Sequence, residues 1–311
     1  MRIFAAAEVD QALDYKVLAE RLRQAFRAGC AVPLRHRHLI PTLGGSDASL
    51  LLMPAWQSGR HIGIKVTTVF PDNPARGLPT IMGAYLLLDA RTGALLALID
   101  GPSLTARRTA AASALAASYL AREDSERLLM VGTGTLAPHL IRAHAAVRPI
   151  HNVLVWGRTP AKAKRLAAHL DRPTFRVGFT EDLEAAARGA HVISCATPAT
   201  APLIRGAWLA PGTHVDLVGG FTPEMREADD ETVTRARIFV DTYEGALSEA
   251  GDILQPIRSG ILRQDDIAGD LFELTRGERA GRRFYGQITL FKSVGTALED
   301  LAAAQLVVRM V

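Results

Sequence analysis

The sequence predicts an α/β fold in which a doubly wound parallel sheet domain is inserted into a discontinuous α+β domain. From residue 127 to about 289, apolar strand patterns alternate with helical patterns, which is typical of a parallel sheet. Before that, short strand patterns are joined by turn residues, and after it a helical pattern closes the chain. We therefore assign residues 1–108 and 290–311 to a substrate-binding and dimerisation domain, and 109–289 to a dinucleotide-binding domain.

The N-terminal region opens with a helical pattern that Asp10 can cap and that runs to about Ala28, where Gly29 stops it. Four apolar runs follow, separated by Gly, Pro, Asp and Asn: SLLLMPAW, HIGIKVTTVF, IMGAYLLLD and ALLALID. They predict a meander of mostly antiparallel strands. The segment SLTARRTAAASALAASYLA then predicts a long alanine-rich helix capped by Ser103 or Thr105.

The second region alternates regularly. We expect strands at RLLMVG, NVLVWG, TFRV, HVISCAT, THVDLVGG and RIFVDT, with helices such as PAKAKRLAAHL and EDLEAAARG between them. The segment ITLFKSVGTALEDLAAAQLVVRM predicts a last strand and a closing helix, which return the chain to the first domain.

Composition narrows the class of function. The 311-residue chain has a net charge of +4 spread over scattered arginines, which favours anionic small molecules over nucleic acid as partners. Cys30 and Cys195 lie far apart, so we expect no disulfide. The N-terminus lacks a signal-peptide pattern, and no apolar run reaches the roughly 20 residues of a membrane span. We expect a cytoplasmic enzyme without a membrane partner.

The segment VGTGTLA carries the strongest motif. Gly132, Gly134 and Ala137 form the pattern G-x-G-x-x-A between a predicted strand and a predicted helix. In a Rossmann-type domain the first glycine makes the tight turn, the second lets a pyrophosphate approach the backbone, and the small third residue lets helix and strand pack closely. An ordinary glycine turn is the alternative, but the second strand some twenty residues on favours dinucleotide binding.

The end of that second strand bears on the cofactor. NAD sites usually place an acidic residue there for the ribose 2′-hydroxyl, whereas this chain has Gly157, Arg158 and Thr159. A cation and a hydroxyl suit a 2′-phosphate, so we expect NADPH to be preferred and NADH to be possible. The alternative is a solvated surface arginine.

Several cations outside the inserted domain are candidates for substrate binding. Lys65 interrupts an apolar strand. Its own ammonium group could lie in a cleft and donate a proton or a charge-assisted hydrogen bond, or it could simply face solvent. Arg107 and Arg108 lie in the first turns of the alanine-rich helix, where the helix dipole favours acids rather than arginines. Binding of an anion, such as a substrate carboxylate, would explain why arginines stand there. Arg35 is a further candidate clamp. His36 and His38 lack a third ligand, so we expect no metal.

These motifs together resemble the ornithine cyclodeaminase/mu-crystallin family of NAD(P)-dependent imine-handling enzymes, over nearly the whole chain. The marks are GIKV, LTARRTAAAS, VGTGTLA, GAHVISCATPA, PGTHVDLVGG and ITLFKSVGTALED. The resemblance implies a homodimer formed through the first domain. It implies that Lys65 binds substrate, that Arg108 and Arg35 bind its carboxylate, and that Thr80, Ser293 and Val294 line the junction of cofactor and substrate. The implied cofactor contacts are Thr135, Leu136, Arg158, Thr197, Val218 and Gly219.

Two departures from the family's cyclodeaminases are informative. They carry an aspartate after the paired glycines and a glutamate before Leu-Met-Pro, whereas this chain has Phe221 and Leu51. Apolar side chains cannot relay protons or pair a second ammonium group. The resemblance therefore points to the branch that reduces cyclic ketimine carboxylates, Δ1-pyrroline-2-carboxylate and Δ1-piperideine-2-carboxylate, with Phe221 as a wall of the substrate site. An amino-acid dehydrogenase of the alanine type, an ornithine cyclodeaminase and a non-catalytic mu-crystallin-like binding protein remain alternatives.

Overall fold

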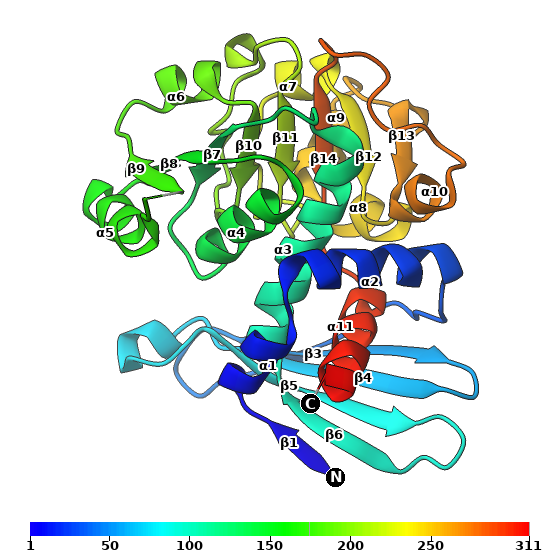
Figure 1. The fold of residues 1–311 in the computed structure, drawn as a ribbon. Coiled ribbons are helices and arrows are strands. Elements are labelled where there is room, and N and C mark those ends of the chain that lie inside the picture. Colours follow the sequence, from blue (N-terminus) through cyan, green and yellow to red (C-terminus); the bar gives the residue numbers. More distant parts are fainter. Residues whose placement is uncertain (174, 311) are drawn as a thin grey trace. The chain divides into compact units, whose positions relative to one another are not determined.

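The computed structural model describes residues 1–173 and 175–310. The chain forms two compact units (Figure 1). Unit 1 comprises Met1–Thr109 and the segment from Thr296 to the C-terminus, and unit 2 comprises Ala110–Gly295. Unit 1 is a helix-covered mixed sheet and unit 2 is a doubly wound parallel sheet, which confirms the predicted fold class.

Unit 1 is built on a six-stranded sheet of order β1-β6-β5-β4-β3-β2. Its strands are β1 (Arg2–Phe4), β2 (His36–Ile40), β3 (Ala48–Gln57), β4 (His61–Val69), β5 (Ile81–Asp89) and β6 (Leu95–Asp100). The four expected strands, β3 to β6, pair antiparallel with their neighbours, as predicted. Two strands that were not predicted extend the sheet: β2 pairs antiparallel with β3, and β1 pairs parallel with β6. The unit also contains α1 (Ala6–Ala12), α2 (Tyr15–Ala28), the short helix η1 (Asn73–Arg76) and α11 (Ala297–Met310).

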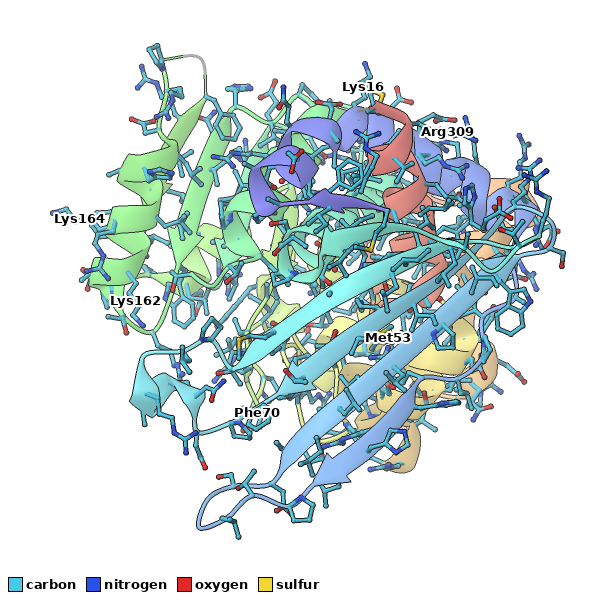
Figure 2. The ribbon with its side chains drawn as sticks, turned by 90° about the horizontal axis from the view of Figure 1, so that it is seen from below. Lys16, Met53, Phe70, Lys162, Lys164 and Arg309 are labelled. Atoms are coloured by element: carbon cyan, nitrogen blue, oxygen red, sulfur yellow. The ribbon has the colours of Figure 1, made fainter. Side chains whose placement is uncertain are left out.

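The two faces of this sheet differ. Helix α11 packs on β3, β4 and β5 and against α2. Because side chains alternate along a strand, one face of the sheet turns Gly63, Lys65 and Tyr85 toward the helices, and all three are buried. The opposite face carries apolar side chains that are only partly buried, including Pro54, Ile64 and Leu86, which lie side by side in the strand register. Figure 2 looks onto the strands of this sheet from below.

Two helix starts differ from the prediction. Asp14, not Asp10, caps α2, because its carboxylate accepts the amides of Lys16 and Val17. The alanine-rich helix α3 (Gly101–Leu120) begins before Ser103, whose own amide donates to the Asp100 carboxylate at 2.8 Å. In both cases a nearby aspartate supplies the acceptor for the free amides of the first turn.

Unit 2 is built on an eight-stranded sheet of order β13-β12-β14-β11-β10-β7-β8-β9, and every pairing in it is parallel. The strands are β7 (Arg127–Val131), β8 (Asn152–Trp156), β9 (Arg176–Phe179), β10 (Val192–Cys195), β11 (His214–Leu217), β12 (Arg237–Val240), β13 (Ile267–Asp270) and β14 (Thr289–Lys292). The helices are α4 (Ala137–Val147), α5 (Pro160–Leu170), α6 (Leu183–Gly189), α7 (Asp230–Arg235), α8 (Tyr243–Glu249), α9 (Gly251–Arg258) and α10 (Leu271–Arg276), with the short η2 (Gly206–Trp208) and η3 (Gln264–Asp266).

The division of the chain differs from the prediction at its second boundary. We expected the first domain to resume at about residue 290, but β14 pairs with β11 and β12 in the parallel sheet, so unit 1 resumes only at Thr296. The first boundary, between Thr109 and Ala110, falls inside α3. Among the described residues, no helix is both long and apolar enough to span a membrane.

Candidate active site

Unit 1 contains a buried cluster of four charged side chains, Lys65 on β4, Arg108 on α3, and Glu299 and Asp300 on α11. The Lys65 Nζ lies 2.8 Å from an Asp300 carboxylate oxygen, and Arg108 Nε donates to the other oxygen at 2.9 Å. Arg108 Nη1 donates to Glu299 Oε2 at 2.6 Å. The four charges cancel, which is how proteins tolerate ionised groups out of contact with water.

This environment changes the proton affinities of the cluster. Burial, with the neighbouring positive charge of Arg108, lowers the pKa of Lys65 to about 8, although Asp300 opposes the change. Burial alone would raise the pKa of Asp300, but Arg108 and Lys65 hold that pKa below its usual range. Lys65 therefore remains mostly protonated at neutral pH, yet it releases its proton far more readily than an ordinary lysine.

The remaining candidate residues of unit 1 are Arg35, Thr80 and Arg107. Arg35 is partly buried, and its positive charge contributes to the lowered pKa of Lys65, so it lies near the cluster. Thr80 is partly buried just before β5, where its carbonyl accepts the Phe70 amide. Arg107 points elsewhere, since it binds the Asp10 carboxylate at 2.8 Å and the Leu13 carbonyl at 2.9 Å.

Sequence reasoning did not identify Glu299 and Asp300, although a signal was present. Two adjacent acids, Glu299 and Asp300, lie in the first turn of α11. Residues 297–307 of this helix are all buried, and apart from these acids they are almost wholly apolar. Acids in a first turn suit the helix dipole, which is the ordinary explanation for them. Their complete burial required cationic partners, and only the fold could show that these are Lys65 and Arg108.

In unit 2 the glycine loop joins β7 to α4. Gly132 has φ +123°, and a Cβ there would approach the Ala196 carbonyl oxygen to 2.6 Å, so the turn requires glycine. At Gly134 a Cβ would meet nothing within 4 Å, which leaves open space in front of the helix. Helix α4 begins without a side-chain cap. Within the first turn, the Ala137 amide donates to the Gly134 carbonyl at 3.1 Å and Pro138 has no N–H. A helix N-terminus beside an open approach still favours a phosphate, because the helix dipole places partial positive charge there.

The other loop residues lie around this opening. Thr135 is exposed and Leu136 is half-buried at the start of α4, while Ala137 is buried as close helix–strand packing requires. Arg158 and Thr159 are exposed directly after β8. Thr159 begins α5, but its hydroxyl makes no capping hydrogen bond, and among the described residues Arg158 forms no ion pair.

Three further candidates lie where β10, β11 and β14 end. Thr197 is engaged by Glu227, whose carboxylate accepts its amide at 2.7 Å and its hydroxyl at 2.9 Å. Val218 is buried. The Ser293 hydroxyl is buried and has no hydrogen-bond partner within the described part of the chain. An orphaned buried hydroxyl at the carboxyl edge of a parallel sheet suits a ligand that supplies the missing partner.

The paired glycines after β11 have specific steric reasons. A Cβ at Gly219 would overlap the Thr197 backbone and the Glu227 carboxylate. A Cβ at Gly220 would lie 2.6 Å from Asp252 Oδ2 and 3.2 Å from Lys292 Nζ, which themselves form a fully buried ion pair at 3.1 Å. Phe221 follows with 47% of its surface exposed. Val294 is half-buried, and its amide donates to Asp241 at 2.8 Å.

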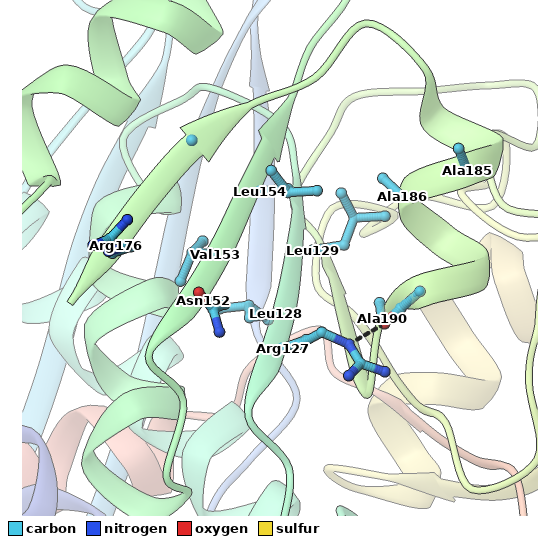
Figure 3. Close-up of a pocket in the computed structure, with 12 residues that line it drawn as sticks. Arg127, Leu128, Leu129, Asn152, Val153, Leu154, Arg176, Ala185, Ala186 and Ala190 are labelled. Carbon is cyan, nitrogen blue, oxygen red and sulfur yellow. Dashed lines mark hydrogen bonds between the residues drawn. The ribbon is translucent and has the colours of Figure 1, made fainter.

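A pocket on the same sheet lies away from these residues (Figure 3). Its lining includes Arg127, Asn152 and Arg176, the first residues of β7, β8 and β9. The glycine loop, in contrast, follows the last residue of β7. Dinucleotides bind beyond the carboxyl ends of parallel strands, so this pocket, at the amino ends, is not the cofactor site.

Comparison with known proteins decides the family. The sequence profile of the ornithine cyclodeaminase/mu-crystallin family matches residues 2–311. The chain belongs to this family. The family profile thus spans both segments of unit 1 as well as the whole of unit 2.

Three similar proteins are informative. A Δ1-pyrroline-2-carboxylate reductase of Paracoccus denitrificans is 43% identical, over 89% of this chain and 90% of its own. The structure of Thermococcus litoralis Δ1-pyrroline-2-carboxylate reductase with NADH and L-proline has a TM-score of 0.92 and 34% identity, covering 100% of this chain and 97% of that one. An archaeal alanine dehydrogenase dimer with bound NAD has a TM-score of 0.91 and 29% identity, covering 100% and 95%.

Proposed function

We propose that this protein reduces small cyclic ketimine carboxylates with NAD(P)H, converting Δ1-pyrroline-2-carboxylate to L-proline and Δ1-piperideine-2-carboxylate to L-pipecolate. The observation that carries the proposal is the buried Lys65–Asp300–Arg108 cluster in a chain that has Phe221 and Leu51 where a cyclodeaminase has carboxylates. The reductases among the relatives, one of them solved with NADH and L-proline, support it.

The residues present fit a dinucleotide. Gly132 and Gly134 provide the turn and the open approach, Thr135, Leu136 and Ala137 begin the helix behind it, and the orphaned Ser293 hydroxyl offers a further contact. When bound, the reduced nicotinamide supplies a hydride to the C=N carbon. Thr197, Val218 and Gly219 complete the proposed cofactor site.

We propose NADPH as the preferred cofactor and NADH as a possible one. The support is the exposed pair Arg158 and Thr159 after β8, where an NAD site usually has an acid. The neighbouring structures with NADH or NAD show that this fold also accepts the cofactor without a 2′-phosphate. Arg158→Ala should therefore weaken NADPH binding much more than NADH binding. Equal losses would contradict the assignment.

In the proposed mechanism the unit 1 cluster binds the carboxylate of the substrate and supplies a proton to its imine. The positive charges of Lys65 and Arg108 are balanced by Asp300 and Glu299, and Arg35 is a further cation near Lys65 that we propose helps to attract a carboxylate. Arg108 can orient that carboxylate through its remaining N–H groups. Lys65, with its lowered pKa, can donate a hydrogen bond or a proton to the imine region. Thr80, Phe221 and Val294 are proposed to line the substrate site.

A direct assay tests the proposal. Purified protein is incubated with NADPH or NADH and with each of the two cyclic ketimines, and the absorbance of the reduced cofactor is followed. We expect turnover with at least one ring size. The same protein is given ornithine with NAD, and ammonia is measured; ammonia release without ketimine reduction would overturn the proposal.

One alternative has a specific observation in its favour, the close structural likeness to an alanine dehydrogenase. Oxidative deamination of L-alanine with NAD, faster than ketimine reduction, would select it. Cofactor binding without turnover of any substrate would instead select a non-catalytic binding protein.

We also propose that the protein is a homodimer formed through the uncovered face of the unit 1 sheet. The supporting observation is the apolar character of that face, and the structural neighbour described as a dimer agrees with it. A cytoplasmic location remains a proposal that rests on the sequence alone.

A further inference from the structure

A single buried carboxylate joins two strand ends at the proposed cofactor edge of unit 2. Glu227 lies between β11 and α7, and its side chain is completely buried. One of its oxygens accepts the amide and the hydroxyl of Thr197, beyond the end of β10, and the other accepts the Gly219 amide at 2.7 Å, beyond the end of β11. These are adjacent parallel strands.

A second set of contacts fixes Glu227 itself. Asp252 on α9 accepts the amide of Glu227 at 2.7 Å and that of Ala228 at 3.1 Å. The other oxygen of Asp252 pairs with Lys292, on β14, at 3.1 Å. The absence of side chains at positions 219 and 220 makes room for this arrangement, because a Cβ atom at either position would clash with it. The Glu227 carboxylate is therefore held in a defined position beside the Gly219–Gly220 turn.

The charges around Glu227 determine when it ionises. Lys292 on β14 favours the carboxylate, whereas Asp252 on α9 disfavours it, and the Cys195 thiol on β10 stays neutral because burial raises its pKa well above the usual value. Burial is the largest influence and raises the pKa of Glu227 to about 7. A protonated carboxyl group loses acceptor strength toward the two amides that it joins.

We propose that Glu227 is a positioning residue, which acts through Thr197 and Gly219 to hold the ends of β10 and β11 ready for the nicotinamide cofactor, so that cofactor affinity follows the ionisation of Glu227. This inference rests on the proposed function. It adds a residue that touches neither substrate nor cofactor in that scheme, and it makes binding dependent on pH near neutrality.

The test measures binding rather than turnover. The Kd for NADH is determined by fluorescence between pH 6 and pH 8, with NADH used because the 2′-phosphate of NADPH titrates in the same range. As pH falls from 8 to 6, the ionised fraction of Glu227 drops to about one tenth, so the Kd of the wild-type protein should rise about tenfold. Glu227→Gln should bind weakly at both pH values, with a flat profile.

A matched control is available in the same loop. Glu224 is exposed, so Glu224→Gln should keep the affinity and the pH profile of the wild type. If Glu227→Gln also keeps both, the inference is overturned while the proposed function stands. Should that variant not fold, a wild-type Kd that is flat from pH 6 to pH 8 overturns the inference by itself. Wild-type protein that binds no NADH at any pH would overturn the proposed function as well.

Discussion

At the scale of single residues, Phe221 bears most directly on the choice between reductase and cyclodeaminase. We expect Phe221→Asp to lower kcat/KM for cyclic ketimines at least tenfold, because a carboxylate replaces an apolar wall and repels the carboxylate of the substrate. Since the side chain is half-exposed, the unfolding temperature should change little. Phe221→Leu is the control and should stay near wild type. A ketimine reductase that tolerates the aspartate would show that the position does not select the reaction.

Lys65 gives a prediction in pH. Burial lowers its pKa to about 8, so the protonated form is lost as pH rises through that value. If the ammonium group assists the reaction, kcat/KM should fall above about pH 8. Lys65→Met should lower kcat/KM about 100-fold or more, as loss of one preorganised donor does, and should remove this descending limb. An unchanged limb in the variant would assign the titration to another group.

At the scale of elements, the two glycines of the loop between β7 and α4 should have different roles, Gly132 in stability and Gly134 in cofactor binding. Gly134→Ala places its Cβ in open space, so the unfolding temperature should stay within a few degrees of wild type while NADH binding weakens at least tenfold. Gly132→Ala forces an alanine to φ +123° against the Ala196 carbonyl and should destabilise the protein itself. Thermal unfolding and cofactor titration of both variants measure this contrast. If a folded Gly134→Ala protein bound NADH with wild-type affinity, the cofactor site would not be at this loop.

The elements also show what a sequence reveals. The strands from β7 to β12 were predictable because apolar runs alternate with helical periods, and the glycine loop because its chemistry is local in the chain. Strand β9 is the exception in position, since it runs two residues later than the predicted TFRV, whose Thr174 lies outside the described residues. Strand β13 was not predicted, since IAGD is short and half small residues. The buried acids Glu227, Asp252 and Asp300 were not predicted either, because their partners are distant in sequence. Lys292 stands alone in an apolar strand, as Lys65 does, and was the missed signal.

At the scale of the whole molecule, the segment that leads from unit 2 back to unit 1 shows what the sequence leaves open. The segment ITLFKSVG predicts a strand, but its local sequence does not indicate in which of the two sheets that strand pairs. Its pairing with β11 and β12 is decided by contacts with residues about fifty to seventy-five positions away. Such long-range pairing is the part of a fold that periodicity cannot specify.

The uncovered face of the unit 1 sheet gives the last prediction. Pro54, Ile64, Leu86 and Leu98 lie in one row across four strands, all on the face opposite α11 and all apolar. A contiguous apolar face of this kind is typical of a stable subunit interface. Leu86→Arg would bury an unpaired charge at the centre of such an interface, so we expect the dimer to dissociate into monomers in analytical ultracentrifugation.

The control for this change is Val17→Arg, which puts the same charge on an exposed apolar position of α2 and should leave the dimer intact. Circular dichroism of both variants establishes that the subunits remain folded. A Leu86→Arg protein that sediments as the wild-type dimer would place the interface on another surface. A monomeric wild-type protein would mean that the row of apolar side chains has a different partner, because a face so apolar gains free energy whenever it leaves water.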